Sequence, residues 1–318
     1  MTNYSIEQQQ FGLKKETVRG TAETTITTYI PIDPSSLPEY KLNLINDENL
    51  RGIAEIYPPI AGTLDGAAPI KIDVDPDHFG EILNSLLGHD TVTNLSPAYV
   101  HTFDRLTSGI QFPSYSLFLD RGMNKKVYNL SVCKSLQLTQ SVDGKLSAQT
   151  QWIFQQEASS SATFTPAWSQ PNPFSFYQNA LALGGSSNYD IKTWSITIDN
   201  QAKALRKLTG KQYIADVICA DKFKVNGTFT IIFEDETERA KFLANTSSSL
   251  TITITGSIIP TTATNYSLTI TIPEIHYTAF PFGEDEKLLA ANVTFDAFYN
   301  ISAAKSIEVA LANTIAAY

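Results

Sequence analysis

The second half of the sequence repeats the patterns of the first half in the same order. An alternating strand pattern that ends in Asn or Asp and leads into a Leu-Arg pair occurs twice, and three further blocks also have a counterpart. The matched blocks are residues 41–52 with 195–207, 70–75 with 229–235, 127–132 with 265–270 and 146–152 with 289–295. Partners stay about 140 to 160 residues apart. This repeat predicts two similar modules in tandem. It also indicates that selection acts on the geometry of the modules rather than on a catalytic activity.

The length of the chain agrees with two modules. A chain of 318 residues has room for about two domains of about 150 residues each. A segment rich in Ser, Pro and Asn at residues 159–173 separates the halves and is typical of a linker. We therefore place the first module, with an N-terminal arm, at residues 1–165 and the second module at residues 166–318.

Alternation of apolar and polar residues with period two dominates the chain, which is typical of half-buried β-strands. The clearest runs are residues 26–32, 116–119, 136–139, 250–255, 267–272 and 306–311. Helical patterns are scarce. Residues 75–88 predict a short helix with Asp75 as the N-cap, Pro76 in the first turn and Gly88 as the stop, and residues 235–244 are its counterpart. Each module is thus expected to be a mainly antiparallel β-structure with one short flanking helix.

Charge and cysteine content narrow the class of protein. The formal net charge of -9 argues against a protein that holds nucleic acid by neutralising phosphates, although it permits a surface past which DNA slides. No leader-like pattern and no stretch of about 20 apolar residues occurs, which predicts a soluble protein made in a cytoplasm with no membrane partner. Cys133 and Cys219 lie in apolar runs and are expected to be buried, reduced thiols.

No group of residues predicts catalysis, a metal or a cofactor. Asp73, Asp75 and Asp77 have part of a calcium-loop spacing, but Gly80 and Asn84 stand where the later loop positions need other residues, so helix capping explains the acids equally well. The four histidines are dispersed and lack a nucleophile elbow. The Gly-Gly-Ser-Ser turn at residues 184–187 lacks the end of a phosphate loop. We expect no enzyme activity.

Two long polar excursions follow the matched first strands, at residues 47–66 and 201–216. Pro and Gly interrupt the first, whereas the second is basic. Loops of about 15 residues inside compact β-domains are unusual and often functional. The basic run could face a phosphate backbone, an acidic neighbour or only solvent.

Several segments, in this order along the chain, resemble the phage major tail protein family, the tail tube proteins of long-tailed phages. The opening Phe-Gly-Leu-Lys-Lys-Glu-Thr-Val-Arg-Gly-Thr-Ala at residues 11–22, followed by Tyr-Ile-Pro-Ile, is similar to the start of that family. The other similar stretches are residues 79–88, 99–103 with the strand at 113–117, and 195–200. The resemblance covers nearly the whole chain.

The resemblance implies a fold and a function. Each module should be an antiparallel β-sandwich or partial barrel with one flanking helix, and sheets of neighbouring modules should join into an inner barrel. With two modules per chain, three chains would make a pseudo-hexameric ring. Stacked rings would form a hollow tube that encloses the tape measure protein and conducts double-stranded DNA during ejection. Tail terminator and baseplate or tip proteins are the other implied partners, and the protein would be made in the host cytoplasm and reside in the virion.

Two sets of residues are expected to make assembly contacts. Both excursions should contact the adjacent ring, and removal of residues 51–64 is expected to leave a folded protein that cannot polymerise. The N-terminal arm, residues 11–22, should lie across a neighbouring subunit or ring. The ring-contact residues are Leu50, Arg51, Ile56, Tyr57, Lys203, Arg206, Lys207 and Lys211, and the arm residues are Lys14, Lys15, Glu16 and Arg19.

Two other functions remain open at this point. A β-rich tail-tip module that binds a receptor or carbohydrate would need exposed aromatic residues clustered with Asn or Asp. Trp152, Trp168 and Trp194 are instead scattered, and core packing or a covering role is expected of them. A hydrolase would need a nucleophile and base pair, which the sequence does not supply.

Overall fold

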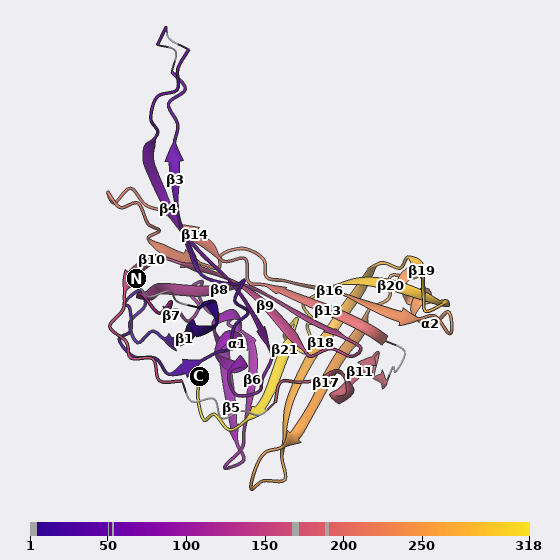
Figure 1. The fold of residues 1–318 in the computed structure, drawn as a ribbon. Coiled ribbons are helices and arrows are strands. Elements are labelled where there is room, and N and C mark those ends of the chain that lie inside the picture. The colour runs from indigo at the N-terminus through magenta and orange to yellow at the C-terminus, as the bar shows by residue number, and fades with distance from the viewer. Residues whose placement is uncertain (1–4, 50, 53, 167–171, 188–190) are drawn as a thin grey trace.

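The computed structural model describes residues 5–49, 51–52, 54–166, 172–187 and 191–318, and these residues form a mainly antiparallel β-structure. Over this part of the chain the only α-helices are α1 (Phe79–Leu87) and α2 (Thr237–Leu243), one in each half. The sheets are not closed into a barrel, and they stack as the layers of a sandwich (Figure 1). The predicted fold class, mainly β with one short helix per half, is therefore confirmed.

The strands vary from two to 17 residues in length. In the first half they are β1 (Gln10–Lys15), β2 (Thr28–Tyr29), β3 (Glu39–Ile45), β4 (Ile60–Asp73), β5 (Gly88–Asn94), β6 (Tyr99–Arg105), β7 (Tyr115–Asp120), β8 (Lys125–Ser141), β9 (Ser147–Phe154) and β10 (Gln156–Ser159). In the second half they are β11 (Asn179–Leu183), β12 (Ser186–Ser187), β13 (Ile191–Asp199), β14 (Lys203–Leu205), β15 (Asp216–Ile218), β16 (Lys224–Ile232), β17 (Ser248–Ile258), β18 (Asn265–Ala279), β19 (Phe282–Asp285), β20 (Leu288–Ala297) and β21 (Glu308–Asn313). Two single-turn helices, η1 (Ile6–Gln8) and η2 (Phe176–Gln178), complete the described elements.

One layer is a run of eight strands that crosses both halves of the chain, which we call the wall sheet. Its order is β3-β4-β9-β8-β13-β16-β20-β19, with every neighbouring pair antiparallel. The other layer, which we call the cover sheet, runs β5-β6-β21-β18-β17-β11. A smaller group has the order β2-β1-β7-β8-β10 and uses the first part of β8. The long β8 changes layers along its length, because its first part pairs with β7 and β10 and its second part with β9 and β13.

The core lies between the wall sheet and the cover sheet. Alternate residues of each wall strand point inward, such as Ile196 and Ile198 on β13, and both are at most 1% exposed. The cover sheet supplies Ile252, Ile270 and Val309 from the opposite side. This arrangement follows from the period-two pattern, since successive side chains of a strand point to opposite faces. The inward set is apolar, and the outward set is mostly Ser, Thr, Asn and Gln.

The two halves use the same pairing within the wall sheet. Gly66 on β4 lies opposite Phe154 on β9, and Gly227 on β16 lies opposite Phe295 on β20. A Cβ atom at Gly66 would lie 2.4 Å from the Phe154 ring, and one at Gly227 would lie 2.6 Å from the Phe295 ring. Each half therefore needs a glycine where a phenylalanine ring crosses the neighbouring strand.

These pairings correct the residue alignment of the repeat. Tyr40 pairs with Gly66, and Ile196 pairs with Gly227, so Tyr40 corresponds to Ile196. The sequence blocks instead aligned Lys41 with Ser195, which differs from this correspondence by two residues. They also aligned Trp152 with Phe295, whereas the strand pairing puts Phe154, two residues later, at the position of Phe295. A shift by two residues keeps the same side chains facing the core, so alternation alone does not detect it.

Local predictions agree with the structure in most places. α1 ends at Gly88, which is left-handed with φ 83°, as a helix stop requires. The helix begins later than predicted: His78 is the N-cap residue, and Asp75 accepts the backbone N–H groups of Asp77 and His78. The strand predicted at residues 26–32 is shorter, because only Thr28–Tyr29 pair with β1. Cys133 and Cys219 are buried free thiols, as predicted.

The β3–β4 hairpin projects from the body of the molecule (Figure 1). Leu44, Ile45 and Ile60 near its far end are 56%, 58% and 67% exposed. These apolar side chains are therefore mostly open to solvent in the single chain.

Candidate assembly surfaces

The two halves of the chain join through one antiparallel strand pair in the wall sheet. Ser135 to Ser141 of β8 pair with Asp199 to Thr193 of β13 over seven residue pairs. Leu136 faces Ile198 across this joint, and all of the inward side chains are buried. The joint therefore has the hydrogen bonds and the packed core of any internal strand pair.

The wall sheet has an open strand at each end. Over the described residues, β3 pairs only with β4, and β19 pairs only with β20. Leu42 on β3 is 42% exposed and Phe282 on β19 is 45% exposed. An open edge with exposed apolar side chains is a template for pairing with another chain.

The second excursion packs on the first half of its own chain. Gln212 accepts the Leu64 backbone N–H, and Arg206 donates to the Leu64 carbonyl and forms an ion pair with Asp65. The short β14–β15 pair closes the base of this excursion, because β15 begins at its last residue, Asp216. A small apolar cluster beneath it contains Phe112, Leu130, Val132, Ala202, Ile214, Val217 and Cys219. The excursion thus fastens the two halves together in addition to any contact with another ring.

The predicted ring-contact residues fall into two groups. On the second excursion, Arg206 is bound within the chain, Lys203 forms an ion pair with Asp221, and the Lys211 ammonium lies 5.2 Å from the centre of the Tyr213 ring. Lys207 is exposed beside them. The excursion therefore keeps only part of its predicted positive charge free.

On the first excursion, the predicted residues lie near the tip of the hairpin. Arg51 forms an ion pair with Asp47 and lies 4.4 Å from the centre of the Tyr57 ring. Ile56 is 98% exposed. Leu50 lies outside the described residues. The tip therefore presents apolar and charged side chains away from the rest of the chain.

The predicted arm residues are bound within their own chain. Lys14 pairs with Glu23, and Lys15 donates to the Tyr318 carbonyl. Hydrogen bonds from Lys14 and from the Thr17 backbone lower the pKa of Glu23 from 4.5 to about 2. These two lysines lie on β1, inside the first half of the sandwich.

The other two arm residues link distant segments. Glu16 is 9% exposed and accepts hydrogen bonds from Ser114, Gly20 and Leu130. The Arg19 guanidinium donates to Asp216 and to the carbonyls of Phe112 and Val217. The arm thus ties the second excursion to the first half, and this role was not predicted from the sequence.

Sequence reasoning also missed a buried histidine between the halves. β21 of the second half pairs with β6 of the first, and His101 lies on β6 with no exposed surface. Its Nδ1 lies 2.8 Å from an Asp90 carboxylate oxygen, and its Nε2 lies 2.8 Å from the Ile315 carbonyl oxygen. Both ring nitrogens therefore face acceptors, which only the doubly protonated imidazolium satisfies. Burial lowers the pKa of His101, but these hydrogen bonds outweigh it and raise the pKa above the ordinary 6.5.

This geometry predicts a pH-dependent contribution of His101 to stability. A raised pKa in the folded state stabilises the fold below pH 6.5, and the contribution is lost as pH rises through the folded pKa. The substitution His101→Gln should cost about 1.5 to 3 kcal/mol at pH 6, since hydrogen bonds to a charged group are removed. Urea unfolding of both proteins from pH 6 to 9 measures the gap, which should narrow as pH rises. A gap that is constant or widens would contradict a charged His101.

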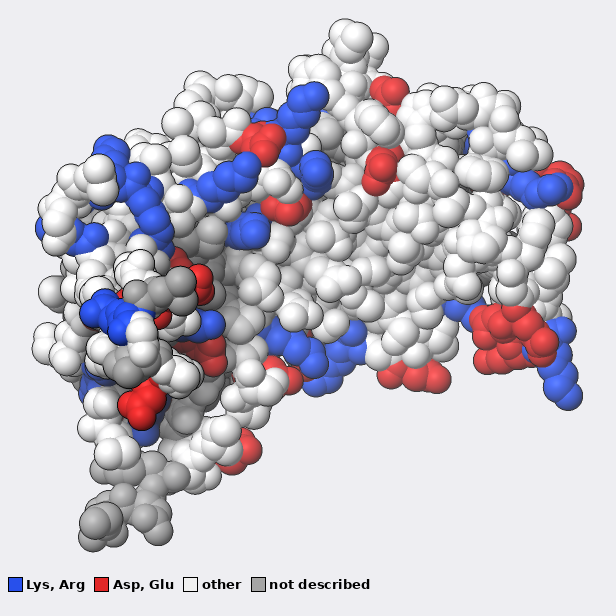
Figure 2. Space-filling model, turned by 90° about the horizontal axis from the view of Figure 1, so that it is seen from above, with Lys and Arg blue, Asp and Glu red and all other residues white. Residues whose placement is uncertain are grey.

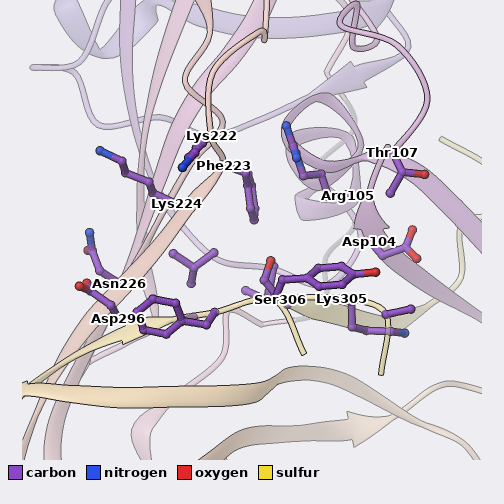
Figure 3. A pocket seen from close by; sticks show the side chains of 16 residues that line it. Asp104, Arg105, Thr107, Lys222, Phe223, Lys224, Asn226, Asp296, Lys305 and Ser306 are labelled. Carbon is purple, nitrogen blue, oxygen red and sulfur yellow. The ribbon is translucent and has the colours of Figure 1, made fainter. Parts of the chain in front are cut away.

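A pocket lies where the two halves meet (Figure 3). It has a volume of about 740 Å³ and is lined by the end of β6, the start of β16 and the segment after β20. Lys222, Lys224 and Lys305 contribute positive charge, and the Arg105 guanidinium lies 5.2 Å from the centre of the Phe223 ring. No histidine or cysteine is among the residues that line the pocket.

The described residues contain no group of three or more His, Cys, Asp or Glu side chains placed to hold a metal ion. No helix in this part of the chain is long and apolar enough to cross a membrane. Trp152 and Trp194 are 1% and 5% exposed, as expected for core residues, so neither offers a surface on which a sugar could stack. Trp168 lies outside the described residues.

Two comparisons with known proteins bear on the family of the chain. No curated protein matches the sequence of the chain. A family model described as phage tail tube protein matches residues 7–297, which is most of the chain. The chain therefore belongs to the phage tail tube protein family.

Proposed function

We propose that three copies of this chain close into a ring in which β19 of one copy pairs with β3 of the next. As a tail tube protein, the chain is a structural component of the virion and not an enzyme. The observation that carries the proposal is the β8–β13 joint. This strand pair joins the two wall segments within one chain, and the β19–β3 contact would repeat it between chains.

The internal joint supports a residue register for the proposed joint between copies. Leu136 to Thr139 of β8 pair with Thr150 to Ser147 of β9, and Phe282 to Asp285 of β19 pair with Ala291 to Leu288 of β20. Because Phe154 and Phe295 occupy the same place, 141 residues apart (295 − 154), Ala291 corresponds to Thr150. Phe282 therefore corresponds to Leu136, and β19 corresponds to the part of β8 that pairs with β13.

The same reasoning places the partner strand. Tyr40 corresponds to Ile196, so Leu42 corresponds to Ile198. Since Leu136 pairs with Ile198, Phe282 of one copy should pair with Leu42 of the next, and Gly283 should pair with Lys41. This register brings together the two half-exposed apolar side chains at the open edges. Full burial of an exposed side chain of this size is worth about 1.5 to 3 kcal/mol, so covering the exposed part of each of these contributes roughly half of that.

Ring closure follows from the repetition of one contact. The β19–β3 contact joins two different surfaces, and such head-to-tail contacts give rings when the rotation closes. Residues 1–165 and 166–318 then act as two tube modules, so three chains supply six wall segments. Fusion of the modules makes half of the lateral joints intramolecular, which raises their effective concentration.

Rings are then proposed to stack through the β3–β4 hairpin. The exposed Leu44, Ile45 and Ile60 of this projecting hairpin would be covered by the adjacent ring. Stacked rings form the hollow tube that encloses the tape measure protein and through which double-stranded DNA passes at ejection. The tail terminator and the baseplate or tip proteins would close its two ends.

A cysteine pair tests the ring and its register together. In the double variant Lys41→Cys/Gly283→Cys, oxidation should join neighbouring copies, since directly opposite residues lie about 4.5 to 5.5 Å apart between Cα atoms and disulfides span about 4.4 to 6.8 Å. A Cβ atom at Gly283 has no neighbour closer than 3.9 Å, so that substitution is tolerated. Denaturing gels should show covalent dimers and trimers, with trimers as the largest product. Negative-stain microscopy of the same sample should show rings or tubes.

The matched control is the pair Asn43→Cys/Gly283→Cys, which shifts one cysteine by two residues on the same face. Diagonal positions lie about 7 to 8 Å apart, so this pair should cross-link far more slowly. Equal cross-linking of both pairs would contradict the register. A ladder that continues beyond trimers would contradict a ring of three chains.

A further inference from the structure

The pocket between the two halves is basic, although the chain as a whole is acidic. Its lining has four cationic side chains and two acidic ones, a net charge of +2, whereas the whole chain has a net charge of -9. Lys222 and Lys224 line the pocket and are exposed. On the face seen from above, charged side chains gather in separate groups with a broad area of few charges between them (Figure 2). The positive charge of the pocket is therefore a local feature of an acidic molecule.

Aromatic side chains give this pocket an apolar wall. Phe298 and Tyr299 line it, and they are 48% and 59% exposed. The Phe223 ring lies between Lys222 and Arg105 (Figure 3). The volume of about 740 Å³ is within the range of about 300 to 1,000 Å³ that binding sites have, so several side chains of a partner would fit. A partner for this site needs negative charge beside apolar groups.

Some charged side chains of the lining are engaged within the chain. Asp104 contacts the His89 imidazole, and Lys305 forms an ion pair with Glu308. Asp296, the other acid, lies opposite Asn226 on the neighbouring strand. By contrast, the Arg105 Nε atom is buried and has no hydrogen-bond partner among the described residues. The pocket thus keeps positive charge that the chain itself does not neutralise.

The far end of the β3–β4 hairpin has the complementary chemistry. Residues 46–59, which we call the hairpin tip, contain three acidic residues and one arginine, a net charge of -2. The arginine, Arg51, forms an ion pair within the tip, and Glu48 and Glu55 are exposed. Ile56, next to Glu55, is 98% exposed. The tip therefore presents carboxylates beside an apolar side chain.

The hairpin holds its tip away from the body of its own chain (Figure 1). Gly66 is the first residue of β4 that pairs with β9, and Ile60 is the last position at which β4 pairs with β3 before the tip. The strand rises about 3.3 Å per residue, so the tip begins about 20 Å beyond the wall sheet. The tip is thus placed to meet another copy of the chain and not the pocket of its own chain.

We infer that the hairpin tip of one chain docks in the basic pocket of a chain in the adjacent ring. The inference rests on the proposed function, because it names the surface that receives the hairpin when rings stack. Glu48 and Glu55 would meet Lys222 and Lys224, and Ile56 would cover the aromatic wall. Opposite charges across such a contact speed association and fix which surfaces meet. Each chain has one tip and one pocket, so the three tips of a ring match the three pockets of the next.

Two charge-reversal variants test the contact. The pocket variant is Lys222→Glu/Lys224→Glu and the tip variant is Glu48→Lys/Glu55→Lys, all at exposed positions, so both proteins should fold. Each variant alone should form rings, but its tube fraction should fall at least about tenfold, because like charges then face each other. Rings of the two variants mixed together should form tubes again, since each tip then meets a pocket of opposite charge. Negative-stain microscopy and sedimentation measure rings and tubes.

The control variant Lys134→Glu/Lys145→Glu makes the same change in net charge at exposed lysines that do not line the pocket, and it should still form tubes. A chain that carries all four tip and pocket substitutions should also form tubes by itself. Wild-type tube formation by the pocket variant alone would overturn the inference and would leave the pocket to a soluble anion or to DNA phosphates. Two variants that each lose tubes and do not recover them on mixing would also overturn it. Absence of rings from the wild-type protein would instead count against the proposed function.

Discussion

Deletion of residues 47–59 is expected to abolish tubes and leave rings when one glycine is inserted after Asn46. The resulting Asn-Gly pair supplies the two-residue turn that keeps Ile45 paired with Ile60. The segment is the far end of the β3–β4 hairpin, and the two strands keep their pairing from Ile45 and Ile60 to the body of the molecule. The core contains none of the deleted side chains, so folding should be unchanged. Stacking should fall to background, because Ile56, 98% exposed in the single chain, has no other proposed partner than the adjacent ring. Negative-stain microscopy and sedimentation measure rings against tubes.

The bounds of this deletion follow from the structure. Removal of residues 51–64 would also cut into β4, where Leu64 pairs with Leu42 and binds Gln212, so it would damage the fold as well as stacking. Deletion of residues 207–211, the tip of the second excursion, is the matched comparison and should reduce stacking less, because that excursion is anchored on its own chain by Arg206. Long tubes from the 47–59 deletion would refute stacking through the hairpin.

The substitution Gly227→Ala is expected to destabilise the fold by about 3 kcal/mol or more, since an added methyl group overpacks a filled site. The new Cβ atom would lie 2.5 Å from the Ser195 carbonyl oxygen and 2.6 Å from the Phe295 ring. One of these contacts is backbone, so the strand itself must shift. Gly66→Ala meets the same obstruction at Phe154 and should cost a similar amount. Urea unfolding monitored by circular dichroism measures the change.

Gly283→Ala is the control for the two buried glycines, because it also places a methyl group on a wall strand. Its nearest neighbour would be the Asn292 amide at 3.9 Å, so its stability should stay within about 0.5 kcal/mol of the wild type. Combining Gly227→Ala with Phe295→Leu should recover part of the loss that Gly227→Ala causes, since the ring is one of its two obstructions. Equal losses of stability from Gly227→Ala and Gly283→Ala would show that the phenylalanine rings do not explain why positions 66 and 227 are glycine.

The strands were predictable from sequence because their outward and inward residues alternate so regularly. β17 and β18 are examples, with Ile or Leu alternating with Thr or Ser over many residues. The register between the two halves was not predictable to the residue, since alternation repeats every two positions and a two-residue shift leaves the pattern unchanged. Gly66 and Gly227 each lie opposite a phenylalanine, and aligning these two glycines would have given the correct register between the halves.

The contacts that the two excursions make within the chain were not predictable from the sequence. The excursions stood out as long loops, but nothing in the sequence shows that Arg206 binds Asp65 about 140 residues away, because that contact depends on the folded positions of both. His101 looked like one of four dispersed histidines, and its burial follows from β21 pairing with β6. The arm was identified by its resemblance to a family, while its binding to the chain itself comes from Glu16 and Arg19.

The β8–β13 joint has a consequence for the accuracy of assembly. A ring of separate single-module subunits can gain or lose one unit, so rings of five or seven segments are neighbouring errors. Chains whose two segments are joined by seven residue pairs within one polypeptide add segments only in twos. The nearest wrong rings then have four or eight segments, and each joint must absorb roughly twice the angular error. In the proposed ring, covalent pairing of the segments would thus limit errors in tube diameter.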